Sequence, residues 1–304
     1  MGRERLHGLV VEAPFAFGGR SVAGDLPADV YVTWASDGAR PRQQTPEGEE
    51  IAARGDRRMV VVRHPEGVLL WVPDLVEAQI DRDLAHVRAA CDPVRRDLGA
   101  IVLSSNLMAL LVVLRGACVL HGSAVEVDGH AIAFVGPSGA GKTTSAALGM
   151  RAGHRLVSDD LLRLEPDGSV HAGATAVRLR SFAAAALRDH LPSVEPGPIA
   201  TADGRLSVAS RPPTAAKLAL RVIVRPRLVA PSSATTVREV RGRKRLTALL
   251  GVPRVAGLRD EKIHRAQFSL LAEIAERVPI VDAEIPWPPA DPALAFRDLL
   301  ELLP

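Results

Sequence analysis

The stretch "FVGPSGAGKTTSAALGMRAGHRLVSDD", residues 134–160, decides the fold of this chain. It opens with the end of an apolar run, continues through a complete match to the phosphate-loop pattern G-x-x-x-x-G-K-[ST], and closes on two adjacent aspartates. The glycines allow consecutive backbone N–H groups to turn toward phosphate oxygens at the positive end of a helix dipole. The order of apolar run, loop, helix and second apolar run predicts an α/β protein with a nucleotide site.

Each part of the loop has an expected role. Lys142 would neutralise the β- and γ-phosphates, and the Thr143 hydroxyl would join the Mg²⁺ shell. We therefore expect ATP and Mg²⁺ as cofactors, with GTP open as an alternative to ATP. The nucleotide contacts are expected to come from Gly136, Ser138, Gly139, Ala140, Gly141, Lys142, Thr143 and Thr144.

The aspartate pair narrows the chemistry. Asp159 and Asp160 end the predicted strand that follows the helix, so they return to the phosphates if this strand neighbours the one before the loop. One carboxylate could then hold Mg²⁺ while the other accepts a proton from an attacking hydroxyl. Adjacent carboxylates also repel, which raises one pKa unless a metal offsets the repulsion. The alternative is a pair of surface turn residues.

A hairpin precedes the loop. In "ACVLHGSAVEVDGHAIAFVG", residues 117–136, two apolar runs flank Asp128-Gly129, a pair suited to a type I′ turn. This hairpin would place His121 near the γ-phosphate or the aspartate pair, as an orienting partner or a proton shuttle. A purely structural histidine is the alternative.

The rest of the chain predicts two domains, a β-rich domain over residues 1–97 and a catalytic domain over 98–304. Strands are expected at LVVEA, DVYVTWA, RMVVVRHP and VLLWVP, and a helical pattern over 74–96. A second, buried helix is expected over 98–114, because a membrane span usually needs about 20 residues with fewer polar interruptions.

Beyond the aspartates, we expect a hairpin that turns at residues 166–168. Helices are expected at SFAAAALRDHL and EKIHRAQFSLLAEIAERV, a strand at KLALRVIVRP, and a Pro-rich irregular stretch over 192–216.

Composition limits the partners. A net charge of +3 over 304 residues does not by itself imply a polyanionic partner, and an aromatic content of 3% does not favour base stacking. Two cysteines, Cys91 and Cys118, are too few for a disulfide framework, and the first residues lack a secretory pattern. We expect a cytoplasmic protein that binds neither nucleic acid nor membrane.

Arginines are candidates for contacts with the substrate. Arg178 and Arg180 alternate in "AVRLRSF", where two guanidinium groups on one face could clamp an anionic acceptor or the γ-phosphate. Solvated surface arginines are the alternative. The basic segment over 237–254 predicts a solvated helix start, with a mobile substrate loop as the other interpretation.

Together, "HGSAV", "FVGPSGAGKTT" and "GHRLVSDD", between His121 and Arg163, resemble the catalytic domain of HPr kinase/phosphorylase and its smaller relatives. Those relatives include kinases of peptide natural-product gene clusters, and the loop-to-aspartate layout is also similar to ATP-dependent phosphoenolpyruvate carboxykinases. The resemblance implies a phosphate-loop kinase core of this type. It implies that His121 and the aspartate pair belong to the active site, with Asp159 as the base and Asp160 as a metal ligand. Together with the loop residues, the expected catalytic residues are His121, Lys142 and Asp159, and the expected metal ligands are Thr143 and Asp160.

One departure from the family concerns the acceptor. HPr kinases carry a glycine-rich signature after the aspartate pair, and "HAGATAVRLRSFAAAALRDH", residues 171–190, lacks it. We therefore expect a kinase that transfers the γ-phosphoryl group of ATP to a serine-like hydroxyl of a different peptide, protein or small metabolite. The alternatives are a shikimate- or gluconate-type kinase and an ATPase switch or assembly factor without an acceptor. Phosphorylase activity and a homo-oligomeric state stay open.

Overall fold

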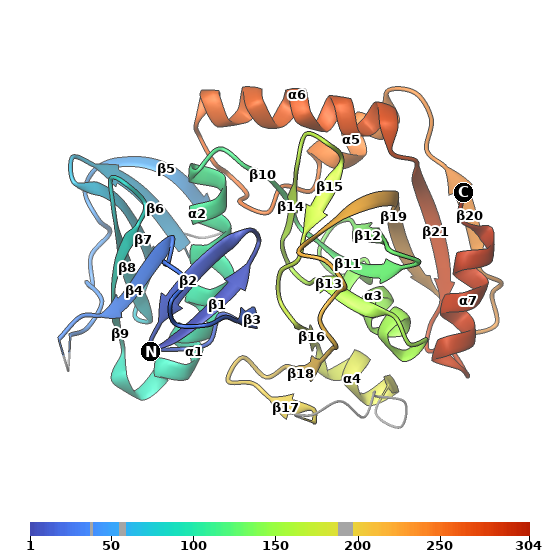
Figure 1. Ribbon diagram of the computed structural model, residues 1–304, viewed down its shortest axis with the longest axis horizontal. Helices are drawn as coiled ribbons and strands as arrows, with labels where there is room; N and C mark the ends of the chain where they lie inside the picture. Colours follow the sequence, from blue (N-terminus) through green and yellow to red (C-terminus); the bar gives the residue numbers. More distant parts are fainter. Residues whose placement is uncertain (37–38, 55–58, 188–196) are drawn as a thin grey trace. The chain divides into compact units, whose positions relative to one another are not determined.

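The computed structural model describes residues 1–36, 39–54, 59–187 and 197–304. The chain forms two compact units: unit 1 is Met1–Ala117 with Val255–Ala266, and unit 2 is Cys118–Arg254 with Gln267–Pro304. Figure 1 colours both units along the chain. The first unit thus extends beyond the expected boundary at residue 97. It also includes the separate segment Val255–Ala266.

Unit 1 contains a nine-stranded sheet in the order β3-β1-β2-β4-β9-β8-β7-β6-β5. Strands β5 to β9 follow one another as an antiparallel meander, whereas β4 pairs in parallel with β2 and β9. The strands expected from the sequence in this region are all present. The strand bounds are β1 (Gly2–Leu6), β2 (Leu9–Ala13), β3 (Arg20–Ser21), β4 (Val30–Trp34), β5 (Glu49–Arg54), β6 (Met59–His64), β7 (Gly67–Val72), β8 (Val76–Asp81) and β9 (His86–Cys91).

The helix expected over 74–96 is wrong. This region forms β8, β9 and a short 3₁₀ turn, η1 (Pro93–Arg95). Val76, Ala78 and Ile80 are buried and alternate with more exposed residues, which is the period of a strand with one buried face. Glu, Ala and Gln favour helices individually, but burial against the sheet overrides such weak local preferences.

The apolar run over 98–114 is helical, as expected. It comprises α1 (Arg96–Val102), a π-helical turn η2 (Leu103–Leu107) and α2 (Met108–Leu114). Gly99 approaches β9 so closely that a Cβ would lie 2.3 Å from Cys91 Sγ, which ties this segment to unit 1. Among the described residues, Pro93–Leu114 is the one helical segment long and apolar enough to cross a membrane by length and composition, and half of it is buried. A core helix meets the same criteria.

Unit 2 contains a second nine-stranded sheet, in which β10-β14-β15-β19-β12-β11-β13 form one path and β21 and β20 continue from β19. The hairpin expected at Asp128-Gly129 is confirmed by positive φ at both residues. The bounds are β10 (Cys118–Leu120), β11 (Gly122–Val127), β12 (His130–Val135), β13 (Arg155–Ser158), β14 (Leu162–Leu164), β15 (Ser169–His171), β19 (Lys217–Val229), β20 (Thr236–Glu239) and β21 (Ile280–Pro286).

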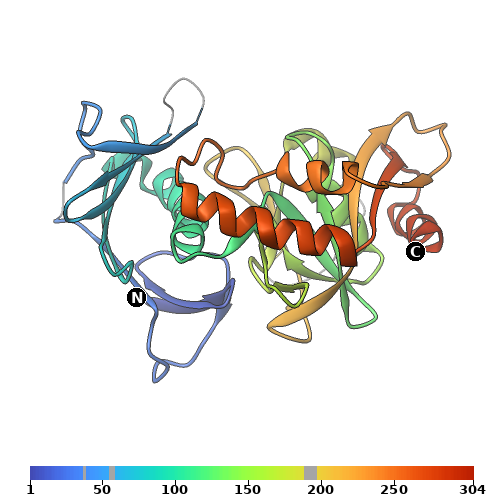
Figure 2. The same cartoon turned by 90° about the horizontal axis from the view of Figure 1, so that it is seen from above.

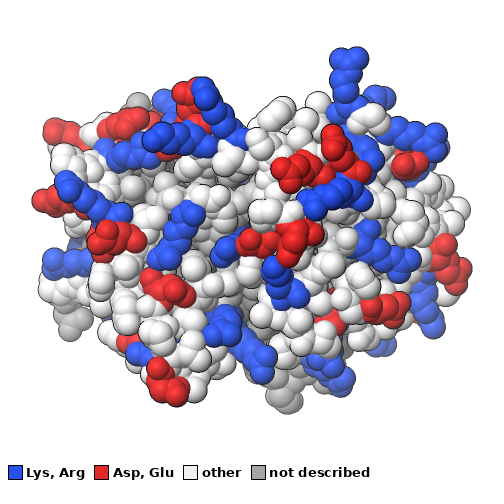
Figure 3. All heavy atoms as spheres, turned by 45° about the horizontal axis from the view of Figure 1, so that its top comes forward, with Lys and Arg blue, Asp and Glu red and all other residues white. Residues whose placement is uncertain are grey.

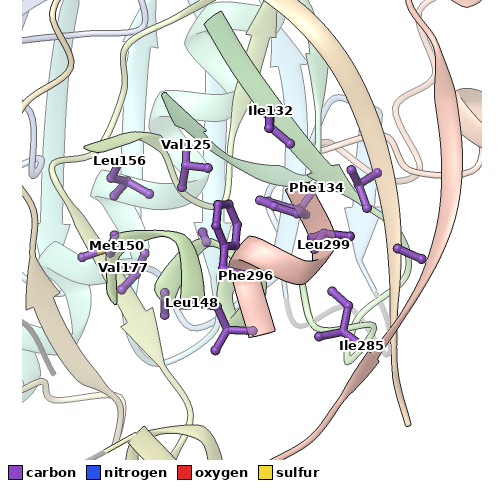
Figure 4. Close-up of a cluster of buried hydrophobic side chains, with 14 of the residues drawn as sticks. Val125, Ile132, Phe134, Leu148, Met150, Leu156, Val177, Ile285, Phe296 and Leu299 are labelled. Carbon is purple, nitrogen blue, oxygen red and sulfur yellow. The ribbon is translucent and has the colours of Figure 1, made fainter. Parts of the chain in front are cut away.

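This sheet is covered on both faces. Ile132 and Phe134 of β12 face a cluster that includes Phe296 of α7 (Pro292–Leu302) and residues of α3 (Lys142–Arg151), shown in Figure 4. Alternate residues of β12 face the opposite cluster, which includes Leu271 and Ile274 from the second half of α6 (Glu261–Arg277), the long helix in Figure 2. Burial on both faces explains why β12 is a continuous apolar run.

A small sheet accompanies the large one in unit 2. It has the order β16-β18-β17, with β16 (Ala176–Leu179), β18 (Leu206–Ala209) and β17 (Ile199–Ala200). Two of these strands lie in the stretch expected to be irregular, so that expectation is wrong over its described part. Val208 is buried in the same cluster as Phe296, which stabilises the extended chain despite the nearby prolines.

The remaining helices are α4 (Ser181–Leu187) and α5 (Lys244–Leu250). The helix expected at SFAAAALRDHL is confirmed to Leu187, and its last residues lie outside the described part of the chain. Strand β21 and helix α7 were not expected from the sequence. On the face in Figure 3, basic and acidic side chains are interspersed, in keeping with the small net charge.

Candidate functional site

The phosphate loop joins the end of β12 to the start of α3, as the sequence predicts. Gly136, Gly139 and Gly141 all have positive φ, between 86° and 152°, a backbone conformation that side chains disfavour. At Gly141 space is limiting as well, because a Cβ would lie 2.8 Å from Leu228 Cγ. The loop conformation therefore depends on its glycines for both reasons.

Lys142 reaches back across the loop. Its Nζ donates to the carbonyl oxygens of Gly136 and Pro137, each at 2.9 Å, and the residue is buried. Burial lowers the pKa of the ammonium. The negative charges of Asp160 and Asp159 oppose this lowering, whereas the positive charge of Arg180 adds to it. The ammonium thus lies inside the loop, where it can meet phosphate oxygens.

Strand β11 brings the ends of β12 and β13 together. It is antiparallel to both, with Gly122 opposite Val135 and Ala124 opposite Ser158. Strands β12 and β13 are therefore not direct neighbours, since β11 lies between them. The start of β11 nevertheless meets the ends of both strands at one edge of the sheet, so the loop and the aspartates reach the same place.

Asp159 is held from three sides. Its Oδ1 accepts hydrogen bonds from Ser123 Oγ at 2.6 Å and Thr143 Oγ1 at 2.9 Å, and its Oδ2 accepts one from the Arg178 N–H at 3.2 Å. The residue is only 8% exposed. Burial raises the pKa of this carboxyl and the charge of Asp160 adds to the rise, while the three hydrogen bonds oppose it.

Asp160 has different surroundings. Its backbone is left-handed, with φ of 71°, and its side chain is 31% exposed. Arg254 Nη2 donates to its Oδ2 at 2.7 Å, and His121 Nδ1 lies 3.3 Å from its Oδ1 and 3.1 Å from its carbonyl oxygen. The structure thus brings His121 to the aspartate pair, in contact with Asp160.

Two residues of the site, Ser123 and Arg254, are missing from the sequence expectations. Ser123 lies two residues after His121, so alternation along the chain could have placed its hydroxyl on the same side. For Arg254, the sequence offers no sign of a role in the site beyond its position in the basic segment 237–254. It reaches the site because the chain around Pro253 pairs with Leu120, an arrangement that no local pattern shows.

The two candidate substrate arginines separate in the structure. The guanidinium of Arg178 lies 3.4 Å from Asp203, which also contacts Arg205 at 3.3 Å, so only the backbone N–H of Arg178 reaches Asp159. Arg180 is exposed, and its Nη2 donates to Ser138 Oγ of the loop at 3.2 Å. Of these two arginines, Arg180 is the one whose guanidinium contacts the loop.

The oxygens at the loop suit Mg²⁺. Two adjacent ligands of one octahedral Mg²⁺, each at about 2.0–2.1 Å, lie about 2.9 Å apart. Thr143 Oγ1 and Asp159 Oδ1 lie 2.9 Å apart, which is the length of the hydrogen bond between them and is also compatible with two adjacent ligands of one ion. The part of the chain that the structure describes has no cluster of three or more His, Cys, Asp or Glu residues that could hold a metal. Mg²⁺ at nucleotide sites usually takes only one or two carboxylates, with phosphates and water completing its shell.

Comparisons with known proteins give a distant match. No protein-family model matches the chain, and no curated protein matches it. Among solved structures, the HPr(Ser) kinase/phosphatase from Coxiella burnetii is similar at 15% identity, over 60% of this chain and 94% of that chain, with a TM-score of 0.28. At so low a TM-score, what the site can do has to be derived from its own geometry.

Proposed function

We propose that this chain is an ATP-dependent kinase that transfers the γ-phosphoryl group to a serine-like hydroxyl of a peptide, protein or small metabolite. The observation that supports this proposal is the meeting of a phosphate loop with two aspartates in different surroundings. Asp159 contacts the loop residue Thr143, whereas Asp160 contacts His121. Two carboxylates with separate partners can serve as metal ligand and proton acceptor.

On the nucleotide side, the backbone N–H groups of the loop and Lys142 would bind the phosphates. Thr143 and Asp159 would hold Mg²⁺, which when bound neutralises charge on the β- and γ-phosphate oxygens. The contact of the Asp159 carboxylate with the Thr143 hydroxyl at the phosphate loop supports this assignment. The contacts with ATP would come from Gly136, Ser138, Gly139, Ala140, Gly141, Lys142, Thr143 and Thr144.

On the acceptor side, we assign the base to Asp160, positioned by His121. Its carboxylate would take the hydroxyl proton as the acceptor oxygen bonds to the γ-phosphorus and the bond to the β,γ-bridging oxygen breaks. This order is the reverse of the one that the family resemblance implies. Two observations favour it: Asp159 already contacts Thr143, and Asp160 is the more exposed of the two.

We also propose roles for Arg180 and Arg178 and a compartment for the reaction. Arg180, at the loop through Ser138, would contact the γ-phosphate or an anionic acceptor, and Arg178 would fix Asp159 through its N–H. We place the reaction in the cytoplasm, where ATP is available and where Cys91 and Cys118 stay reduced, as both are free thiols here.

The test is phosphoryl transfer from labelled ATP–Mg²⁺ by the purified protein, with and without a panel of free serine, serine-terminated peptides and small alcohols. Acceptor-dependent turnover with a labelled product is expected. Hydrolysis that is indifferent to every acceptor would instead support the ATPase switch.

The order of the two aspartates has its own test. Asp159→Asn should lose the increase in nucleotide affinity that Mg²⁺ gives, whereas Asp160→Asn should keep this increase but lose transfer. A fluorescent ATP analogue titrated with and without Mg²⁺ measures the affinity of each variant, and the assay with labelled ATP measures transfer. The opposite pattern would restore the order that the resemblance implies.

A further inference from the structure

Arg254 makes a buried ion pair with one of the two aspartates. Its side chain is only 7% exposed, and its Nη2 donates to Asp160 Oδ2 at 2.7 Å. Arginine is seldom so buried unless a partner offsets the cost of removing its charge from water. The planar guanidinium also constrains the direction of the carboxylate that it binds.

The segment that carries Arg254 is fixed to the segment that carries His121. The His121 N–H donates to the carbonyl oxygen of Val252 at 2.9 Å, and the Arg254 N–H donates to that of Val119 at 3.4 Å. Leu120 and Pro253 form the bridge between these two bonds. The same short backbone pairing therefore presents both side chains that contact the Asp160 carboxylate.

Asp160 itself needs such support. Its φ of 71° lies in the left-handed region, which costs a non-glycine residue free energy, although aspartate tolerates it better than most residues. One carboxylate oxygen contacts Arg254 and the other contacts His121. These two contacts on opposite oxygens fix the rotation of the carboxylate as well as its position.

We propose that Arg254 is a positioning residue for phosphoryl transfer: its guanidinium holds one oxygen of Asp160 so that the other stays directed toward His121 and the acceptor hydroxyl. This inference rests on the proposed function, because it requires Asp160 to act on the acceptor. Misplacement of a reacting group by about 1 Å can cost on the order of 10²-fold in rate. Arg254 would therefore affect turnover without touching the nucleotide.

The first experiment compares Arg254→Gln, Arg254→Lys and Arg245→Gln in the full chain. Arg254→Gln should lower kcat on the order of 10²-fold and leave the affinity for the fluorescent ATP analogue unchanged. Arg254→Lys should retain more activity, because an ammonium keeps the charge without the planar fork. Arg245→Gln is the matched control, since Arg245 Nη2 donates at 2.7 Å to the carbonyl oxygen of Val278. Equal kcat for the two glutamine variants would overturn the proposal.

Two further measurements separate positioning from a structural role. Ethylguanidinium added to Arg254→Ala should restore part of kcat, and Arg254→Gln should cost no further turnover once Asp160 is Asn. Full additivity of the two substitutions in kcat, or absence of any rescue, would count against positioning.

The pair can also be tested without turnover. The Tm losses of Arg254→Gln and Asp160→Asn should add to more than the loss in the double variant, because both remove the same contact. Additive losses would overturn the pairing itself. The Tm losses could be non-additive while the wild-type protein transfers phosphate to no acceptor. That result would overturn the proposed function, and with it the positioning role of Arg254.

Discussion

Two aspartates of unit 2, Asp159 at the phosphate loop and Asp167 at the β14–β15 turn, have the same kind of partner and opposite behaviour. Each accepts a hydrogen bond from a serine hydroxyl, Ser123 at 2.6 Å and Ser169 at 2.5 Å. The pKa of Asp159 is raised, mainly by burial. The pKa of Asp167 is lowered, first by its hydrogen bond from Lys217 and then by those from Ser169.

The difference in pKa comes from the burial of Asp159 and from the charged partner, Lys217, of Asp167. Asp167 has a 56% exposed side chain, and Ser169 is its neighbour in the same turn. Asp159 is 8% exposed, and its partners come from β11, α3 and β16. The first cluster therefore combines a near neighbour in the chain with Lys217, which lies 50 residues away on β19, whereas the second takes each of its three partners from a different element. The second is also the kind of site where function is expected.

The lysines near the two aspartates should give the largest contrast. Lys142→Met should reduce phosphoryl transfer at least on the order of 10²–10³-fold, because it removes a preorganised charge from the loop. Lys217→Met, which breaks the exposed pair with Asp167 at 2.7 Å, should leave transfer unchanged. Initial rates at saturating ATP measure both. A comparable loss of transfer in Lys142→Met and Lys217→Met would mean that the difference between the surroundings of Asp159 and Asp167 is unrelated to phosphoryl transfer.

Metal removal should separate the aspartates themselves. Chelation of Mg²⁺ should weaken ATP binding to the wild type and to Asp167→Asn by the same factor. It should change little in Asp159→Asn, whose metal contribution is already lost. Isothermal titration with and without EDTA gives these affinities. If Asp159→Asn kept its full response to Mg²⁺, Thr143 and Asp159 would not be the metal ligands.

The serines offer a matched pair of smaller changes. Ser123→Ala should destabilise the fold by about 1.5–3 kcal/mol, as expected for a hydrogen bond to a charged group, less if Asp159 is protonated. Its loss should also weaken Mg²⁺ binding by about 10–100-fold, because Ser123 orients a proposed metal ligand. Ser169 at the start of β15 is itself buried, 5% exposed, but its hydroxyl bonds to the exposed Asp167 carboxylate, so Ser169→Ala should cost a smaller amount of about 0.5–1.5 kcal/mol. Denaturant unfolding measures the stability of the two variants, and Mg²⁺ titration measures their affinity for the ion. Equal effects of the two alanine substitutions would contradict this prediction.

The dependence of stability on pH should have opposite signs at the two aspartates, with the smallest effect at Asp167. Because the folded pKa of Asp159 is raised, its contribution is present below the unfolded value of about 3.9 and is lost as pH rises through the folded pKa. Because that of Asp167 is lowered, its contribution is present above about 3.9 and is lost as pH falls through the folded pKa. Solvent screens Asp167 and makes its effect slight.

Unfolding in EDTA across pH 3–8 tests this difference. Asp159→Asn should flatten the decline of stability with rising pH, and Asp167→Asn should flatten the decline toward acid. Parallel curves for the two variants would refute the assignment of burial as the deciding cause.

The same contrast explains what the sequence could predict. The loop, its helix, the hairpin at Asp128-Gly129 and the turn near Asp167 follow from residues within a few positions of one another, and all are present. Arg254 escaped prediction because its place depends on the pairing of Pro253 with Leu120. The order of roles that we propose for the aspartate pair rests likewise on which side chains surround each carboxylate, and the spacing of the residues does not contain this.

The helix wrongly expected over 74–96 shows the converse case. Local preferences there favoured a helix, and only the sheet on either side of β8 made the alternation of Val76, Ala78 and Ile80 decisive. Strand β21 pairs with β19, and helix α7 packs against α3. Helix α7 also has a local start signal, because the Asp291 side chain accepts from the N–H groups of Ala293 and Leu294 and Pro292 opens the helix, so the sequence could have predicted it.

The division of the chain into two units limits how recombination within its gene can exchange them. Val255–Ala266 belongs to unit 1, although unit 2 surrounds it in the sequence on both sides. A gene shortened to begin at Cys118 would still encode this segment and would leave Val255 and Leu258, both buried in the full chain, without the rest of their unit. A single recombination point therefore cannot exchange one unit and keep the other whole.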